Sequence, residues 1–152
     1  MYRPLPEKPR VRGQMKGNAV ANPLYDGLFG RHAGKTTPFL HLLDGSTITH
    51  QHFLSRAAQI ANVMLQLELK PGDRVAAQIE KSPEALALYA ACAQAGLVFL
   101  PLNTAYTVDE LAYFIDNSGA SLIVCDGRNQ AALAPLAGRL GAIIETLNAD
   151  GS

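Results

Sequence analysis

Seven polar side chains occupy three short segments, and each segment follows an apolar run of the kind that forms a buried strand. They are Glu80, Lys81, Asn103, Thr104, Tyr106, Asp126 and Arg128. Such groups bind ligands through hydrogen bonds and ion pairs, and Arg128 stands beside a predicted helix start, where free backbone N–H groups help to hold a phosphate. Side chains of these types also stabilise turns, which is the alternative for each one alone. The pattern indicates a binding site, and we assign no residue to catalysis or to a metal.

Motifs for other kinds of chemistry are missing from the sequence. The segment from Gly30 to Thr36 comes closest to a P-loop, but it has three residues between its glycines in place of four and follows a predicted helix. His50 and His52 lie two residues apart, whereas a helical metal pair needs a spacing of four, so we predict solvated surface histidines. Cys92 and Cys125 lack CxxC and metal-ligand spacing, and we predict inert buried thiols.

The composition is typical of one globular domain, with 48% apolar and 17% charged residues among 152. Thirteen basic and thirteen acidic residues give a net charge of zero, which argues against an overall electrostatic grip on nucleic acid or on anionic lipid. No apolar run approaches the length of a membrane span.

The first residues of the chain differ from the rest. Five basic residues, three prolines and a single acid occupy the first 17 positions, and this predicts a disordered basic tail over residues 1–21, before a domain over residues 22–152. Transit peptides are rich in serine and amphipathic, whereas this tail contains no serine and is interrupted by proline. We therefore expect a cytoplasmic protein, with mitochondrial import as the alternative.

The polar segments must be positioned by alternating strands and helices. Apolar periodicity predicts strands over residues 74–79, 97–100, 122–125 and 142–146, and helices over 83–94, 108–117 and 130–139. Short connections in this order predict an α/β fold: a parallel sheet flanked by helices, of flavodoxin-like type, with right-handed crossovers. The continuous apolar run at 97–100 predicts a strand buried on both faces. Because ligands bind beyond the carboxyl ends of parallel strands, we expect the polar segments to converge on one rim.

Capping residues predict where these helices begin and end. Ser82 precedes a helix with proline in its first turn, and Gly96 follows that helix as a left-handed cap. Thr107 and Glu110 form a T-x-x-E capping box, and Gly119 stops the helix that they start.

A smaller part precedes the sheet. We predict a helix over residues 23–31 with Leu24 and Leu28 on its buried face, then a hairpin around the Asp44-Gly45 turn. The helix that follows the cap residue Thr49 carries an apolar stripe at steps of three and four, formed by Phe53, Ala57, Ile60, Met64 and Leu67.

Three segments resemble the adenylate-forming acyl-CoA synthetases. They are GDRVAAQIEKSPEAL at 72–86, GLVFLPLNTAYTVDELAYFI at 96–115 and LIVCD at 122–126. Within that family the run PLNTAYT, at 101–107, is most similar to the malonyl-CoA synthetases. The resemblance covers roughly residues 22–150 and matches the start of the family's large N-terminal domain.

The resemblance implies a reaction in two steps. A carboxylate, malonate in the closest subgroup, attacks ATP to give an acyl-adenylate and pyrophosphate, and the thiol of CoA then displaces AMP. Magnesium would offset phosphate charge in the first step, and a small C-terminal domain would rotate between the steps. The resemblance also implies that Asn103, Thr104, Ala105 and Tyr106 line the CoA side of a cleft, with Arg128 near the nucleotide phosphates.

Several family motifs are missing from these residues. The ATP loop with its lysine, the adenine-binding aromatic segment, the ribose-binding aspartate and the catalytic C-terminal lysine would lie beyond Ser152. We expect the chain to be inactive by itself, to bind no cofactor tightly, and to self-associate through an apolar face left open. The alternatives are a stand-alone flavodoxin-like module that binds a nucleotide or CoA, an interaction protein, and a ligase for another short-chain or aryl acid.

Overall fold

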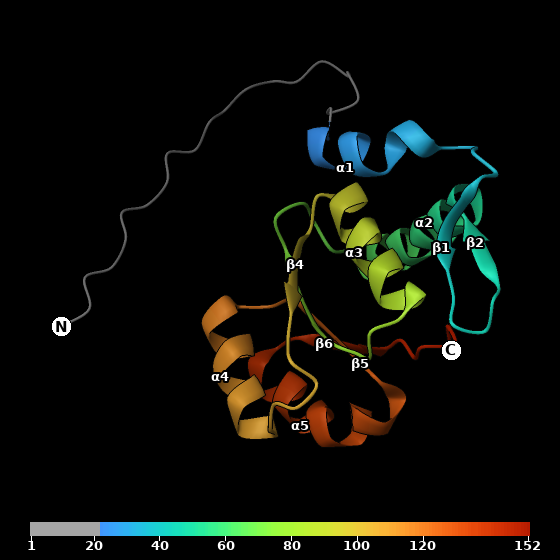
Figure 1. Ribbon diagram of the computed structural model, residues 1–152. Helices are drawn as coiled ribbons and strands as arrows, with labels where there is room; N and C mark the ends of the chain where they lie inside the picture. Colours follow the sequence, from blue (N-terminus) through green and yellow to red (C-terminus); the bar gives the residue numbers. More distant parts are fainter. Residues whose placement is uncertain (1–21) are drawn as a thin grey trace, which may run out of the picture.

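A computed structural model of the protein describes residues 22–152, and the tail predicted for residues 1–21 lies outside the described residues. A parallel sheet of four strands forms the centre, in the order β4-β3-β5-β6 (Figure 1). The strands are β3 (Arg74–Gln78), β4 (Val98–Pro101), β5 (Leu122–Cys125) and β6 (Ile143–Thr146). The predicted α/β class and parallel pairing are confirmed.

Helices cover both faces of the sheet (Figure 1). On one face, α2 (His50–Gln66) and α3 (Pro83–Ala95) pack over a core that includes Val75, Leu88 and Leu122. On the other face, α4 (Val108–Ser118) and α5 (Gln130–Leu140) enclose a core that includes Leu111, Ile115, Ile123 and Leu133. Two buried faces explain why β3 and β5 are apolar along their whole length.

The predicted caps hold the helices in place. The Ser82 hydroxyl accepts a hydrogen bond from the Ala85 N–H at 3.1 Å, and Gly96 adopts the left-handed conformation with φ of 71°. The Thr107 and Glu110 side chains make both bonds of the capping box. These contacts satisfy N–H groups that a helix start would otherwise leave free, so they determine where the loops before α3 and α4 end.

The N-terminal part comprises α1 (Pro23–Leu28), the short 3₁₀ helix η1 (Gly30–His32) and the antiparallel hairpin of β1 (Pro38–His41) and β2 (Thr47–Thr49). These elements lie against α2 and α3 (Figure 1) and share a small core with them. Its buried members are Phe29, Phe53, Ala57, Ala87 and Ala90.

The prediction for α1 was wrong in extent and in orientation. The helix ends at Leu28, and Leu24 and Leu28 are 54% and 49% exposed. Tyr25 and Phe29 face the shared core instead. Two aromatic rings four residues apart bury more apolar area than two leucines do, and this decides the orientation of a six-residue helix.

The prediction that β4 is buried on both faces also needs correction. β4 is an edge strand, and its Val98 is 49% exposed. Phe99 packs on the core beneath α3, whereas Leu100 packs on the core beneath α4. The apolar run therefore reflects contacts of the two central residues with opposite faces, while the outer residues of the strand stay exposed.

Within residues 22–152, no helix is both long and apolar enough to cross a bilayer.

Candidate functional site

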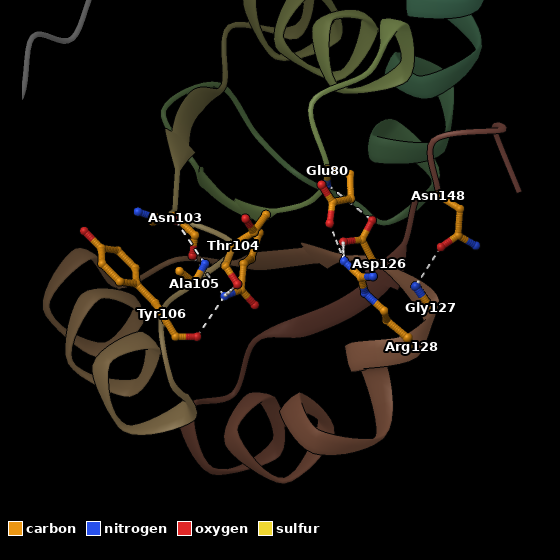
Figure 2. Close-up of polar contacts among 10 residues, drawn as sticks. Glu80, Asn103, Thr104, Ala105, Tyr106, Asp126, Gly127, Arg128 and Asn148 are labelled. Carbon is orange, nitrogen blue, oxygen red and sulfur yellow. Dashed lines mark hydrogen bonds and ion pairs between the residues drawn. The ribbon is translucent and has the colours of Figure 1, made fainter.

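The polar segments lie at the carboxyl edge of the sheet, as predicted from the topology. Figure 2 shows them in two groups: residues 103–106 after β4, and Glu80 with Asp126 and Arg128 at the ends of β3 and β5. The two groups differ in what holds them in place.

A buried side chain of β3, Gln78, holds the segment after β4. Its amide nitrogen donates to the carbonyl oxygens of Asn103 and Tyr106 at 3.0 and 3.1 Å, and the carbonyl of Thr104 lies 3.5 Å away. The side chain is only 4% exposed, so water does not compete for these bonds. Sequence reasoning missed Gln78, although it is the one polar residue among the buried positions of its strand.

The predicted residues of this segment have different surroundings. Asn103 is exposed, and its side-chain oxygen accepts from the Ala105 N–H at 3.0 Å, which stabilises the turn. Thr104 is exposed beside it. Tyr106 is half-buried, and its ring stacks on Phe114 of α4 with a centroid separation of 5.0 Å. Asn103 and Thr104 are therefore exposed to solvent, whereas Tyr106 packs the segment against α4.

An open hollow of about 500 Å³ lies between the ends of β3 and β4 and the start of α3. Its polar lining comes from Glu80, Lys81, Asn103 and Thr104, and its apolar lining from Ala77, Ile79, Ala85, Phe99, Pro101 and Leu102. Among residues 22–152, no carboxylate lies within 4 Å of the Lys81 ammonium. The hollow thus combines an apolar floor with two neutral polar side chains and two opposite charges, Glu80 and Lys81. Because Glu80 pairs with Arg128, Lys81 is the charge that remains to meet an anionic group of an organic molecule.

The second group is a set of ionic contacts around Arg128. Its guanidinium contacts the Glu80 carboxylate and lies 3.6 Å from Oδ2 of Asp126. Asp126 is 5% exposed, and its Oδ1 accepts from the Glu80 N–H at 3.3 Å. Two carboxylates therefore neutralise Arg128. A phosphate would have to displace Glu80 in order to interact with the full positive charge of the guanidinium.

A further contact joins this group to the end of the sheet. The Gly127 N–H donates to the side-chain oxygen of Asn148 at 2.8 Å, at the start of the 3₁₀ turn that carries Arg128 (Figure 2). Asn148 follows β6, so three neighbouring strands contribute to the position of Arg128.

The cysteine prediction is confirmed, and the prediction for His50 is wrong. Burial raises the pKa of the Cys92 thiol to about 12, and burial followed by the Asp126 charge raises the pKa of Cys125 to about 11, so both are protonated at neutral pH. His50 is half-buried against another imidazole, because the N-terminal elements fold over the start of α2. No group of three His, Cys, Asp or Glu residues in the described chain could hold a metal ion.

A second hollow, of about 190 Å³ and mainly apolar, lies between α2 and the β5–β6 side of the sheet. Ile60, Val63 and Met64 line it from α2, and Leu122 and Leu147 from the sheet side. It lies away from the residues that sequence reasoning selected.

A parallel sheet covered by helices, with a small antiparallel hairpin beside it, matches the α/β fold of the adenylate-forming enzymes. The AMP-binding enzyme family matches residues 29–151. The chain belongs to this family.

Solved structures of MatB from Rhodopseudomonas palustris, without ligand and bound to ATP, superpose on this chain with a TM-score of 0.81 and are 42% identical. The match covers 86% of this chain and 26% of MatB. Feruloyl-CoA synthase from Amycolatopsis is 38% identical over 97 residues, which are 63% of this chain and 20% of that protein. Long-chain fatty acid transport protein 1 of Rattus norvegicus is 30% identical over 135 residues, 87% of this chain and 21% of that protein. The chain thus spans about a fifth to a quarter of these relatives.

Proposed function

We propose that this chain is the N-terminal portion of an ATP-dependent acid–CoA ligase whose acid is malonate. The similarity to MatB, a malonyl-CoA synthetase, carries the proposal, because its 42% identity extends over 86% of this chain. The PLNTAYT run and the segment that Gln78 holds both lie within residues 29–151, which the AMP-binding enzyme family matches.

The proposed reaction proceeds in two steps. A malonate carboxylate oxygen attacks the α-phosphorus of ATP, the bond to the pyrophosphate oxygen breaks, and malonyl-adenylate and pyrophosphate form. The CoA sulfur then attacks the activated carbonyl, the bond to AMP breaks, and the thiol proton passes to solvent. Within residues 22–152, no group of three His, Cys, Asp or Glu side chains could hold the Mg²⁺ that accompanies ATP.

In this proposal the hollow at the carboxyl edge forms the CoA side of the cleft. Asn103 and Thr104 face the ligand, Phe99 and Leu102 supply apolar contact, and Lys81 meets an anionic group. Tyr106 stacks on Phe114 and so holds the segment in position. Arg128 binds the nucleotide phosphates after its ion pair with Glu80 breaks.

A hybrid enzyme tests the proposal. Residues 22–152 replace the matching N-terminal segment of R. palustris MatB, and two reactions are measured: malonate-dependent exchange of pyrophosphate into ATP, and formation of malonyl-CoA. We expect both activities. Replacement of Asn103 and Thr104 by alanine should raise the KM for CoA and leave the exchange reaction, which needs no CoA, unchanged. A folded hybrid without either activity would contradict the proposal.

The isolated chain distinguishes this function from a stand-alone module. We expect no pyrophosphate release with ATP, Mg²⁺, malonate and CoA, and no binding as tight as micromolar in calorimetric titrations with CoA or ATP. Micromolar binding of either ligand would favour the flavodoxin-like module instead.

An aryl acid is the second candidate substrate, since the 38% identity to feruloyl-CoA synthase favours it. Ferulate and malonate compared as substrates of the whole protein separate the two. We propose the cytoplasm as the compartment, where ATP and CoA are both available.

A further inference from the structure

A group of four nitrogen-bearing side chains gathers in the N-terminal part of the fold, on elements that contribute nothing to the carboxyl edge. Arg31 and His32 belong to η1, Lys35 follows it, and His50 is the first residue of α2. The rings of His32 and His50 stack with a centroid separation of 4.5 Å and an interplanar angle of 9°. The ring centroid of Phe39 in β1 lies 4.7 Å from that of His50, so the hairpin packs against the stacked rings. We call these four residues the basic cluster.

The hydrogen bonding of His32 is mismatched. Nε of Arg31 lies 3.0 Å from its Nε2, and Nζ of Lys35 lies 3.1 Å from its Nδ1. A neutral imidazole has one acceptor nitrogen, and a protonated imidazole has none. At least one of these contacts therefore brings two donors together, and the geometry lacks an acceptor that could serve both.

The charges around the basic cluster are also unbalanced. No carboxylate of residues 22–152 lies within 4 Å of Arg31 or Lys35, and the first turn of α2 holds no acidic residue. The neighbouring acid is Asp26 of α1, whose carboxylate lies beside Gly30. Desolvation of the ring, and then the charges of Lys35, His50 and Arg31, hold the pKa of His32 below its ordinary value. An anion bound between these groups would favour protonation of the imidazole.

We propose that Arg31, His32, Lys35 and His50 form a binding site for a phosphate group. The guanidinium offers paired donors to two phosphate oxygens, and the ammonium contributes a point charge. Phosphate oxygens are the acceptors that the mismatched contacts lack. The phosphate belongs either to a free inorganic anion or to a nucleotide, including the nucleotide part of CoA.

Titration by NMR tests this with the 152-residue chain. The histidine ring signals are followed with inorganic phosphate, pyrophosphate and adenosine 3′,5′-bisphosphate, with sodium chloride at matched ionic strength as the reference. We expect saturable shifts of the His32 and His50 signals, a rise in the pKa of His32, and weaker binding at higher salt. Saturation by phosphate or pyrophosphate indicates a free anion, and saturation by the bisphosphate alone indicates a nucleotide.

Matched variants distinguish a specific binding site from a nonspecific effect of positive charge. Arg31→Gln and Lys35→Gln should each weaken binding by about fivefold, the effect of one exposed charge pair. Arg139→Gln removes an exposed arginine in the last turn of α5 and should leave binding unchanged. Absence of saturable shifts with all three anions, or equal weakening by Arg139→Gln, would overturn the proposal.

Discussion

The side-chain nitrogen of Gln78 donates to the carbonyl oxygen of Asn103 across 3.0 Å, so a buried residue of β3 determines the course of the chain after β4. Gln78→Leu should destabilise the chain by about 1–3 kcal/mol, because it leaves backbone carbonyls without donors. Urea unfolding measures this change, and faster hydrogen exchange over residues 103–106 should accompany it.

The exposed Gln94 of α3 provides the control for this substitution. Gln94→Leu should change stability by no more than about 0.5 kcal/mol. Equal effects of the two substitutions would show that Gln78 does not anchor the segment.

The capping box of α4 should make stability depend on pH. Hydrogen bonds from the Thr107 backbone, and then from its hydroxyl, hold the pKa of Glu110 below its ordinary value. A depressed carboxyl pKa adds stability above the unfolded pKa, and this stability is lost as the pH falls through the folded value. Glu110→Ala should therefore destabilise the chain at neutral pH and matter progressively less in acid. Urea unfolding of both proteins over this range measures the difference, and a constant difference would contradict it.

Arg128 should matter for nucleotide binding more than for folding. The contact with Glu80 is exposed, so Arg128→Gln should change the unfolding free energy by less than about 1 kcal/mol. In the hybrid enzyme, the same substitution should raise the KM for ATP about tenfold, as expected for the loss of one charge-assisted hydrogen bond. Steady-state kinetics measures this, with Arg139→Gln as the control. An unchanged KM would remove Arg128 from the proposed site.

The apolar hollow beside α2 should cause the isolated chain to self-associate. Val63 lines it and is 48% exposed. Light scattering should show an apparent mass that rises with concentration, and Val63→Lys should suppress this rise. Leu43→Lys alters a fully exposed leucine in the hairpin turn and should have no effect. A monomer at all concentrations would contradict the prediction.

The sequence alone predicted the structure correctly where hydrogen bonds between nearby residues determine it. Ser82, Gly96 and the Thr107–Glu110 box mark helix ends through bonds within a few residues, so α3 and α4 begin where we predicted. The order of strands decides how deeply each is buried, and a single sequence does not contain that order. For this reason Val98 was assigned to a fully buried strand.

The candidate site, like the fold, was predictable from the sequence only in part. The carboxyl-edge rule correctly placed the polar segments, because it depends only on parallel pairing. It did not predict that Glu80 and Asp126 would engage Arg128, or that Tyr106 would face α4. Those contacts depend on side-chain directions that emerge only when the strands assemble.

The end of β3 supports both groups of polar residues at once. The side chain of Gln78 holds the segment after β4, and two residues later the Glu80 N–H bonds to the buried carboxylate of Asp126. A ligand that drew Arg128 away from Glu80 would pull on the same short stretch of backbone that supports Asn103. In the proposed enzyme, a nucleotide bound at Arg128 would therefore displace backbone that supports the proposed CoA side of the cleft, and binding of the two substrates would be coupled without direct contact between them.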